Sequence, residues 1–253
     1  MSDIRILITD LNQTYPDDMV QRLDPDAASS PLRISMTDIP GRNMYCSDEA
    51  CEEIRSRLSK LSSPESGIHF IDTGNYHYMS RVFTSFIKEK YDLILIDNHN
   101  DMQRAGFGDI LSCGSWALDV LEKDTNLGTL YVYGPAVFEK EGEERGICIK
   151  DKNVSGRLYR GMGYDGTSHP LYLSVDKDVL SQSECITNWD QGTLSADELI
   201  GLIKILTQDK KLIGADICGG ISESDAGCSG NVLYENTRSD VMLYRELIKL
   251  NWK

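Results

Sequence analysis

Aspartate and histidine alternate directly after one apolar segment of the chain. The run Leu93–Ile96 is followed by Asp97, His99 and Asp101, spaced two residues apart. If the backbone stays extended past the run, these three side chains point to the same face, because side chains alternate along a strand. Two carboxylates and an imidazole that converge at the end of a buried strand are typical of a metal site. The pattern therefore points to metal-dependent hydrolysis.

Two further apolar segments end in residues of the same kind. Asp176 and Asp178 close the run that begins at Leu171, and His77 follows the run Ile68–Asp72 through a turn containing Gly74. Four carboxylates in one pocket would repel one another, and some would protonate unless divalent cations neutralised them. The predicted ligands are His77, Asp97, His99, Asp101, Asp176 and Asp178.

The donor types restrict which cation is expected. Oxygen and imidazole ligands without a thiolate favour Mn²⁺, with Zn²⁺, Fe²⁺ and Co²⁺ as alternatives. Two such ions about 3.5–4 Å apart share a bridging water and lower its pKa towards neutrality, which generates a hydroxide that attacks an electrophilic carbon. We therefore predict two Mn²⁺ ions per chain.

Other residues of the same types have ordinary structural explanations. The chain has four histidines. His69 alternates with apolar residues inside a run and is expected to pack within a strand, and His169, before a proline, is expected in a loop. A single aspartate at a strand end usually caps a turn, and this is the expectation for Asp72 and Asp216.

The apolar runs alternate with segments of helical periodicity, which favours a doubly wound, mostly parallel sheet with its site beyond the carboxyl ends of the strands. Ser195 and Glu198 form a capping box that predicts a helix start. The charged segment 139–156 is predicted to be a solvated excursion or hairpin. Expected strands are 4–9, 32–37, 68–72, 93–97, 130–133, 171–175 and 212–216, and expected helices are 48–61, 78–89, 115–122, 195–207 and 236–250.

Composition limits the class of protein. The length of 253 residues fits one domain spanning 1–253, and 40% hydrophobic with 26% charged residues is ordinary for a globular protein. A net charge of −14 argues against nucleic-acid or anionic-membrane partners, which need a basic face. Seven scattered cysteines indicate reduced thiols. With no apolar signal segment at the start, the expected location is the cytoplasm.

Three of these motifs together resemble the ureohydrolase superfamily of arginases, agmatinases and formiminoglutamases. They are Gly74–His77, Asp97-x-His99-x-Asp101 and Ser174-x-Asp176-x-Asp178, in the family's order across roughly residues 68–220. The resemblance implies a three-layer α/β/α sandwich with a mostly parallel central sheet and a binuclear Mn²⁺ centre held by the six predicted ligands. It also implies catalytic roles for Asp101, as a proton acceptor, and His99.

The chain departs from the family where the substrate would bind. The glutamate that grips a guanidinium in the family is missing from the stretch 214–220. In place of that glutamate, we predict that the substrate is bound by Asp190, Glu223 and Trp189. The carboxylate of Asp190 or Glu223 could bind a guanidinium through paired hydrogen bonds. Where arginases carry a proton-shuttling histidine loop, the chain has Cys113, which is expected to shape the pocket.

The leading hypothesis is a binuclear Mn²⁺ hydrolase that attacks the planar carbon of a guanidino group and releases urea and an amine. The substrate would be a small molecule or a peptidyl arginine, and the sequence leaves a homo-oligomer open. One alternative keeps the metals and changes the reaction to amide, acetyl or formimino hydrolysis. Another is a metal-binding homologue without catalysis.

Overall fold

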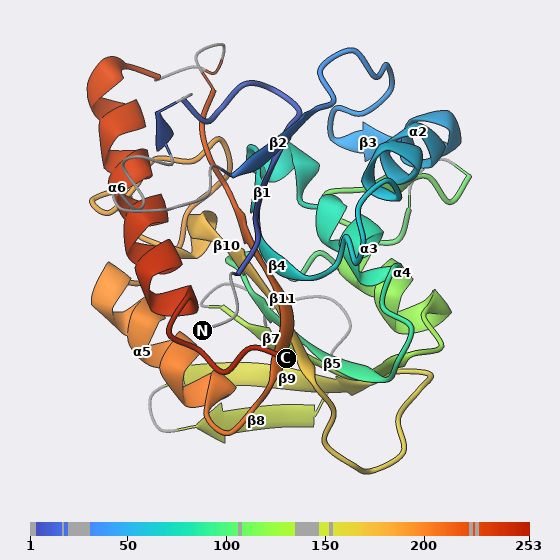
Figure 1. The fold of residues 1–253 in the computed structure, drawn as a ribbon. Coiled ribbons are helices and arrows are strands. Elements are labelled where there is room, and N and C mark those ends of the chain that lie inside the picture. The colour runs from blue at the N-terminus through green and yellow to red at the C-terminus, as the bar shows by residue number, and fades with distance from the viewer. Residues whose placement is uncertain are drawn as a thin grey trace.

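A nine-stranded sheet forms the centre of the computed structural model (Figure 1). The structure describes residues 4–16, 18–19, 31–105, 108–134, 147–151, 154–222, 225 and 228–253. The strands lie in the order β2-β1-β4-β11-β10-β5-β7-β9-β8, and the first seven are mutually parallel. The strand bounds are β1 Ile6–Asp10, β2 Leu32–Ser35, β4 Gly67–Ile71, β5 Tyr91–Ile96, β7 Leu127–Tyr133, β8 Ile147–Asp151, β9 Val154–Arg160, β10 Leu171–Asp176 and β11 Leu212–Cys218.

Helices cover both faces of the sheet, which gives three layers (Figure 1). One apolar core joins the sheet to the helices α2 (Asp48–Leu58), α3 (Met79–Thr84) and α4 (Trp116–Lys123). A second core joins the opposite face to α5 (Ala196–Thr207) and α6 (Gly230–Leu247). The central strands are buried on both faces, as expected for parallel strands between helices. The predicted three-layer α/β/α fold is confirmed.

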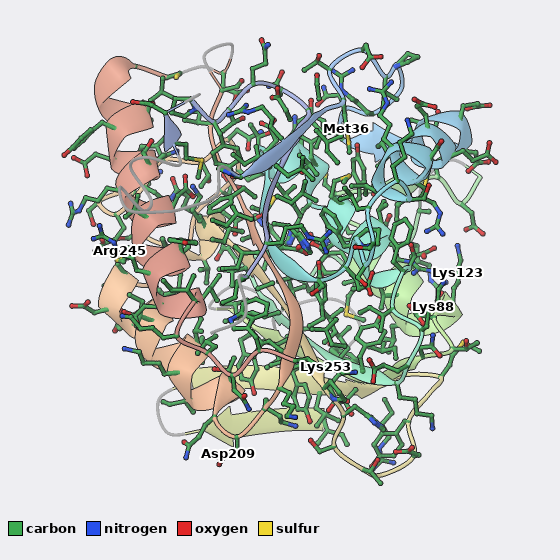
Figure 2. All side chains as sticks on the ribbon, in the orientation of Figure 1. Met36, Lys88, Lys123, Asp209, Arg245 and Lys253 are labelled. Atoms are coloured by element: carbon green, nitrogen blue, oxygen red, sulfur yellow. The ribbon has the colours of Figure 1, made fainter. Side chains whose placement is uncertain are left out.

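The six side chains labelled in Figure 2 come from the core and from the surface. Met36 is fully buried against the first core. Lys88, Lys123, Asp209, Arg245 and Lys253 are exposed at the periphery. Among the described helices, none combines the length and the apolar character needed to cross a membrane.

All seven predicted strands are present, with ends shifted by a few residues. The capping box at α5 is also confirmed, because the Ser195 side chain accepts from the Glu198 backbone and the Glu198 carboxylate accepts from the Ser195 N–H. Helix α6 begins at Gly230, ahead of the predicted start, because Ser229 caps it. Helix α3 ends at Thr84, earlier than predicted. A short antiparallel pair, β3 (Tyr45–Cys46) and β6 (Leu111–Ser112), was not predicted.

The hairpin expected at 139–156 is present in the part that the structure describes. Strands β8 and β9 pair antiparallel, and β9 pairs antiparallel with β7 at the edge of the main sheet. Residues 139–146 of the prediction lie outside the described residues. That residues 1–253 form a single domain stays a prediction.

Candidate metal centre

Four neighbouring parallel strands end at one place and supply the candidate site. Strands β4, β11, β10 and β5 are adjacent in the sheet, so their carboxyl ends meet at one edge. His77 follows β4 through the 3-10 turn Gly74–Tyr76, and Asp176 and Asp178 lie at the end of β10. Asp97, His99 and Asp101 follow β5. The structure brings all six predicted residues together.

The segment after β5 reaches the site by a different backbone path from the predicted one. The extended conformation ends at Ile96, and residues 97–101 form bends. The Asp97 carboxylate accepts a hydrogen bond from the His99 N–H at 2.6 Å, and Asp101 has a left-handed φ of 49°. The alternation of an extended strand is therefore the wrong reason for the convergence. A loop folded around the Asp97 carboxylate turns the three side chains inward.

His77 is the centre of the first ligand group. Its Nδ1 lies 2.9 Å from Asp101 Oδ2, 3.1 Å from Asp97 Oδ2 and 3.3 Å from Asp176 Oδ2. Its other ring nitrogen, Nε2, lies 2.9 Å from Ser174 Oγ on β10. All these side chains are buried. The Ser174 hydroxyl thus holds Nε2 of the imidazole ring, and Nδ1 faces the three carboxylates.

His99 is the centre of the second group. Its Nδ1 lies 2.8 Å from Asp178 Oδ2 and 3.6 Å from Asp97 Oδ1. Its ring is 37% exposed, and it forms an edge-on contact with the indole of Trp189. Asp97 offers one oxygen to each group, since Asp97, His77 and Asp101 form one candidate set and Asp97, His99 and Asp178 form another. Asp97 is therefore common to both groups.

Hydrogen bonds from outside these groups fix the carboxylates. Trp116 Nε1 donates to Asp101 Oδ2 at 2.5 Å, and the Asn98 N–H donates to Asp178 Oδ1 at 3.0 Å. Asp176 Oδ1 accepts from the Asp178 N–H at 2.9 Å. Such supporting partners hold ligands in their binding orientation before a cation arrives.

The pKa shifts reflect the burial of the carboxylates, their repulsion of one another and their hydrogen bonds to the two histidines. Burial, followed by repulsion from Asp178 and Asp97, raises the pKa of Asp176 to about 8. Burial and Asp97 raise the pKa of Asp178 to about 7. Hydrogen bonds to Asp178 and Asp97 raise the pKa of His99 to about 11. Burial lowers the pKa of His77, but hydrogen bonds to Asp101 and Asp97 outweigh it and leave the pKa well above its usual value.

The donor set fits divalent cations. Four carboxylates, all at most 7% exposed, share the site with two imidazoles. Among the described residues that line the pocket, none is a lysine or arginine. Lys177 lies between two of the ligands in sequence, but its ammonium is turned away to Asp240, 2.5 Å distant. The six residues therefore form a donor set that could hold divalent cations.

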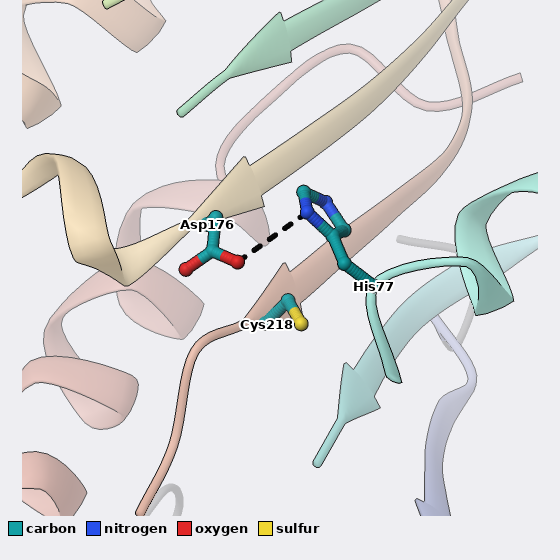
Figure 3. A group of neighbouring side chains, drawn as sticks. All are labelled: His77, Asp176 and Cys218. Carbon is teal, nitrogen blue, oxygen red and sulfur yellow. Dashed lines mark ion pairs between the residues drawn. The ribbon is translucent and has the colours of Figure 1, made fainter. Parts of the chain in front are cut away.

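Cys218 lies beside the site, although it was not among the residues predicted for it. The residue ends β11, and its Sγ, one atom of His77 and one of Asp176 lie within 4.8 Å of one another (Figure 3). All three side chains are buried. The available signal was its position directly after the apolar run that precedes Gly219 and Gly220. A thiol therefore lies beside two of the predicted ligands, and the thiolate-free ligand set stays a prediction.

The walls of the pocket hold only part of the predicted substrate-binding set. Trp189 lies at the rim and donates to Asn75 Oδ1 at 3.0 Å, close over Gly74, where a Cβ would lie 2.5 Å from the indole. Asp190 is exposed and lies outside the pocket lining, and its backbone carbonyl accepts a hydrogen bond from Asn98 Nδ2. Glu223 lies outside the described residues. Asp190 is therefore not placed to grip a substrate.

Neutral groups complete the described lining. Tyr45, Gln103, Ser112 and Cys113 line the pocket together with the predicted metal ligands. Burial raises the pKa of the Cys113 thiol to about 12, so this thiol does not exchange protons at neutral pH. The expectation that Cys113 shapes the pocket agrees with its place in the wall.

The residues predicted to be structural divide into two groups. Asp72 caps a turn as predicted, because its carboxylate accepts from the backbone of Leu11, Asn12 and Thr73. Asp216 does not, since it lies inside β11 and is fully buried, 2.9 Å from His69 Nδ1. His69 is a packed strand residue, and His169 lies in a loop beside Asp165.

Gly219 lies in the stretch 214–220, from which the family glutamate is missing. It has a φ of +85°, and a Cβ there would lie 2.2 Å from Asp176 Oδ1. Any side chain at this position would displace a predicted metal ligand. The backbone path at the end of β11 therefore requires a glycine here.

Comparison with known proteins places the fold. No protein-family model matches the chain. A protein of Thermotoga maritima described as uncharacterized is 31% identical over 153 residues, which are 60% of this chain and 58% of that protein's length. The match therefore spans little more than half of that relative.

Solved structures cover nearly the whole chain. Formimidoylglutamase from Bacillus subtilis superposes with a TM-score of 0.58 at 15% identity, covering 98% of this chain and 87% of that one. Arginase from Medicago truncatula gives 0.60 at 11% identity, covering 96% and 85%. Proclavaminate amidino hydrolase from Streptomyces clavuligerus gives 0.57 at 12%, covering 96% and 92%. The chain has the arginase-like α/β fold, and the resemblance to the ureohydrolase superfamily is supported at the level of the fold.

Proposed function

We propose that the protein is a metal-dependent hydrolase of the ureohydrolase superfamily that cleaves a C–N bond at a planar carbon, with a guanidino group as the leading substrate. The observation that carries the proposal is the convergence of four buried carboxylates and two imidazoles into two groups that share Asp97. The shared fold of arginase and formimidoylglutamase supports it. Fold alone does not define a reaction, so the proposal rests on the site.

The residues have distinct roles in this proposal. His77, Asp97, Asp101, Asp176, His99 and Asp178 would hold two divalent cations, which we propose are Mn²⁺. Bound together, such ions lower the pKa of a shared water and polarise the bond to be cleaved. Asp101 would accept a proton from the attacking water, and Trp116, which donates to Asp101 Oδ2, keeps that carboxylate oriented. Trp189 and the neutral wall would exclude water around the substrate.

The test combines metal analysis with product analysis. Protein purified without chelators should contain divalent metal, and Asp176→Ala should lose both metal and turnover. A panel of arginine, agmatine and arginine-containing peptides should release urea only with metal present. Metal-free protein that gains no cation on dialysis against Mn²⁺, Zn²⁺ or Co²⁺ would overturn the proposal.

A second reaction at the same centre is favoured by one observation. Apart from the predicted metal ligands, no described residue of the pocket lining carries a carboxylate to bind a guanidinium. A neutral amide needs no such partner, so this observation favours hydrolysis of an acylated amine as the second candidate. A formimino group is a smaller cationic amidine, and its hydrolysis at the same centre is tested beside it. Metal-dependent release of a carboxylic acid or formamide, without urea, would select it. Full metal content without turnover on either panel would favour a metal-binding homologue without catalysis.

A further inference from the structure

Cys218 places a sulfur atom among ligands that otherwise offer oxygen and nitrogen. Its Sγ lies in a three-residue set with His77 and Asp176, at the ends of β4, β10 and β11 (Figure 3). Strand β11 lies between β4 and β10, so the end of β11 necessarily points between these two ligands. The thiol is fully buried. Any cation held by His77 and Asp176 would have this sulfur beside it.

The local backbone keeps the sulfur in this position. Cys218 pairs with Asp176 in the β10–β11 register. The next residue, Gly219, passes so close to the Asp176 carboxylate that only a glycine fits. On the other side, Sγ lies 3.5 Å from the Thr73 carbonyl oxygen at the start of the turn that carries His77. The thiol is thus held between the segments that present the two other ligands.

We propose that Cys218 supplies a thiolate ligand to the cation held by His77 and Asp176, so that the two cation positions differ in chemistry. This inference rests on the proposed metal centre and specifies its ligands. The position near His77 combines sulfur, nitrogen and oxygen, and favours a thiophilic ion such as Zn²⁺, Co²⁺ or Fe²⁺. The position of Asp97, His99 and Asp178 has oxygen and nitrogen only and accepts Mn²⁺. This refines the proposal of two Mn²⁺ ions to one thiophilic ion beside His77 and one Mn²⁺ ion at the other position.

An ordinary explanation for a buried cysteine is packing, since thiols behave as small apolar groups. Cys185 fits that explanation, because its Sγ lies near the Lys177 carbonyl oxygen and packs in the second core. Cys218 likewise packs in the first core and lies near a carbonyl oxygen, but it differs in having a carboxylate and an imidazole within reach of its sulfur. The two explanations make different predictions for metal spectroscopy.

Cobalt spectroscopy on the full chain provides the test. Metal-free protein is loaded with Co²⁺, and its absorption is recorded for wild type, Cys218→Ser and Cys113→Ser. We expect two bound ions in wild type and a near-ultraviolet charge-transfer band of a cobalt–sulfur bond. Cys218→Ser should lose the band and keep its visible cobalt bands, whereas Cys113→Ser, altering a second thiol of the same pocket, should keep both. Circular dichroism checks that each variant is folded.

A second measurement does not depend on any variant. X-ray absorption of the zinc-loaded wild type should show a sulfur neighbour at about 2.3 Å from the metal.

In competition between Zn²⁺ and Mn²⁺, Cys218→Ser should weaken zinc binding by at least the ~10–100-fold that loss of a supporting partner costs. Bound cobalt or zinc with only nitrogen and oxygen neighbours would overturn the role of Cys218 and leave the metal centre standing. Failure to bind any cation would overturn both.

Discussion

His77 Nε2 lies 2.9 Å from Ser174 Oγ, a contact between the turn after β4 and the middle of β10. The hydroxyl fixes the imidazole so that Nδ1 faces Asp97, Asp101 and Asp176. Cation binding through Nδ1 requires the proton on Nε2, which Ser174 Oγ can accept. Ser174 therefore orients the ring of a predicted metal ligand.

Ser174→Ala should weaken cation binding by roughly 10–100-fold, because the ring loses its orienting partner. Competition with a fluorescent chelator measures the change for Mn²⁺ and Zn²⁺. Ser80→Ala is the matched control, since Ser80 Oγ lies 3.0 Å from Ser174 Oγ and supports Ser174 through this contact. Its effect should be smaller. Equal affinities for wild type and Ser174→Ala would contradict the assigned role.

Gly219→Ala should disrupt the centre, because the new Cβ would meet the Asp176 carboxylate at 2.2 Å. We expect loss of stoichiometric metal together with lower stability. Gly166→Ala is the control: its φ of +82° is similar, and nothing lies within 4 Å of its Cβ. That variant should show only the backbone cost, about 1–2 kcal/mol, with metal content unchanged. Full metal content in Gly219→Ala would show that Asp176 is not a ligand.

Asp240→Ala should destabilise the metal-free protein by about 3–5 kcal/mol, because it leaves the ammonium of Lys177 buried without a partner. Both side chains of this pair are at most 2% exposed, and the pair connects α6 to the turn between Asp176 and Asp178. Urea denaturation measures the free energy of unfolding. Glu235→Ala removes the exposed pair with Arg238 and should change it by less than about 0.5 kcal/mol. Similar effects for both variants would be inconsistent with this prediction.

The metal-free protein should become less stable as the pH rises from about 5 to about 8. Asp178 and Asp176 titrate near 7 and 8 when folded, against 3.8 for the model carboxyl. The folded state therefore binds more protons than the unfolded state across this range, and stability falls as the pH increases. His99 acts in the same direction, with its pKa raised from 6.5 to about 11. Carboxylates with a lowered pKa, such as Asp38 near 2, are already ionised here.

Thermal unfolding with and without bound cation measures this effect. The melting temperature of the metal-free protein should decrease with pH, and the gain on adding Mn²⁺ or Zn²⁺ should increase, because the cation replaces the protons. Asp176→Asn, without metal, should flatten the pH dependence by removing one of the coupled carboxyls. A metal-free melting temperature that rises between about pH 5 and 8 would contradict the assigned shifts.

Residue spacing was sufficient to predict the seven parallel strands and the six clustered side chains. Apolar runs of strand length that end in aspartate or histidine identify which residues can meet at the edge of a parallel sheet. The same reasoning gave the wrong backbone path for Asp97 to Asp101, because a periodic pattern does not reveal the positive φ of Asp101 or the turn closed by the Asp97 carboxylate. It also assigned Asp216 to a cap, although Asp216 pairs with His69 inside the sheet.

The sequence by itself determined the alternating elements and the Asp97, His99, Asp101, Asp176 and Asp178 pattern, because local periodicity and spacing are written along the chain. Only the tertiary structure decided which strand lies between which others. Placing β11 between β4 and β10 brings Cys218 to His77 and Asp176. Strand order depends on contacts between segments far apart in sequence, so no local pattern encodes it.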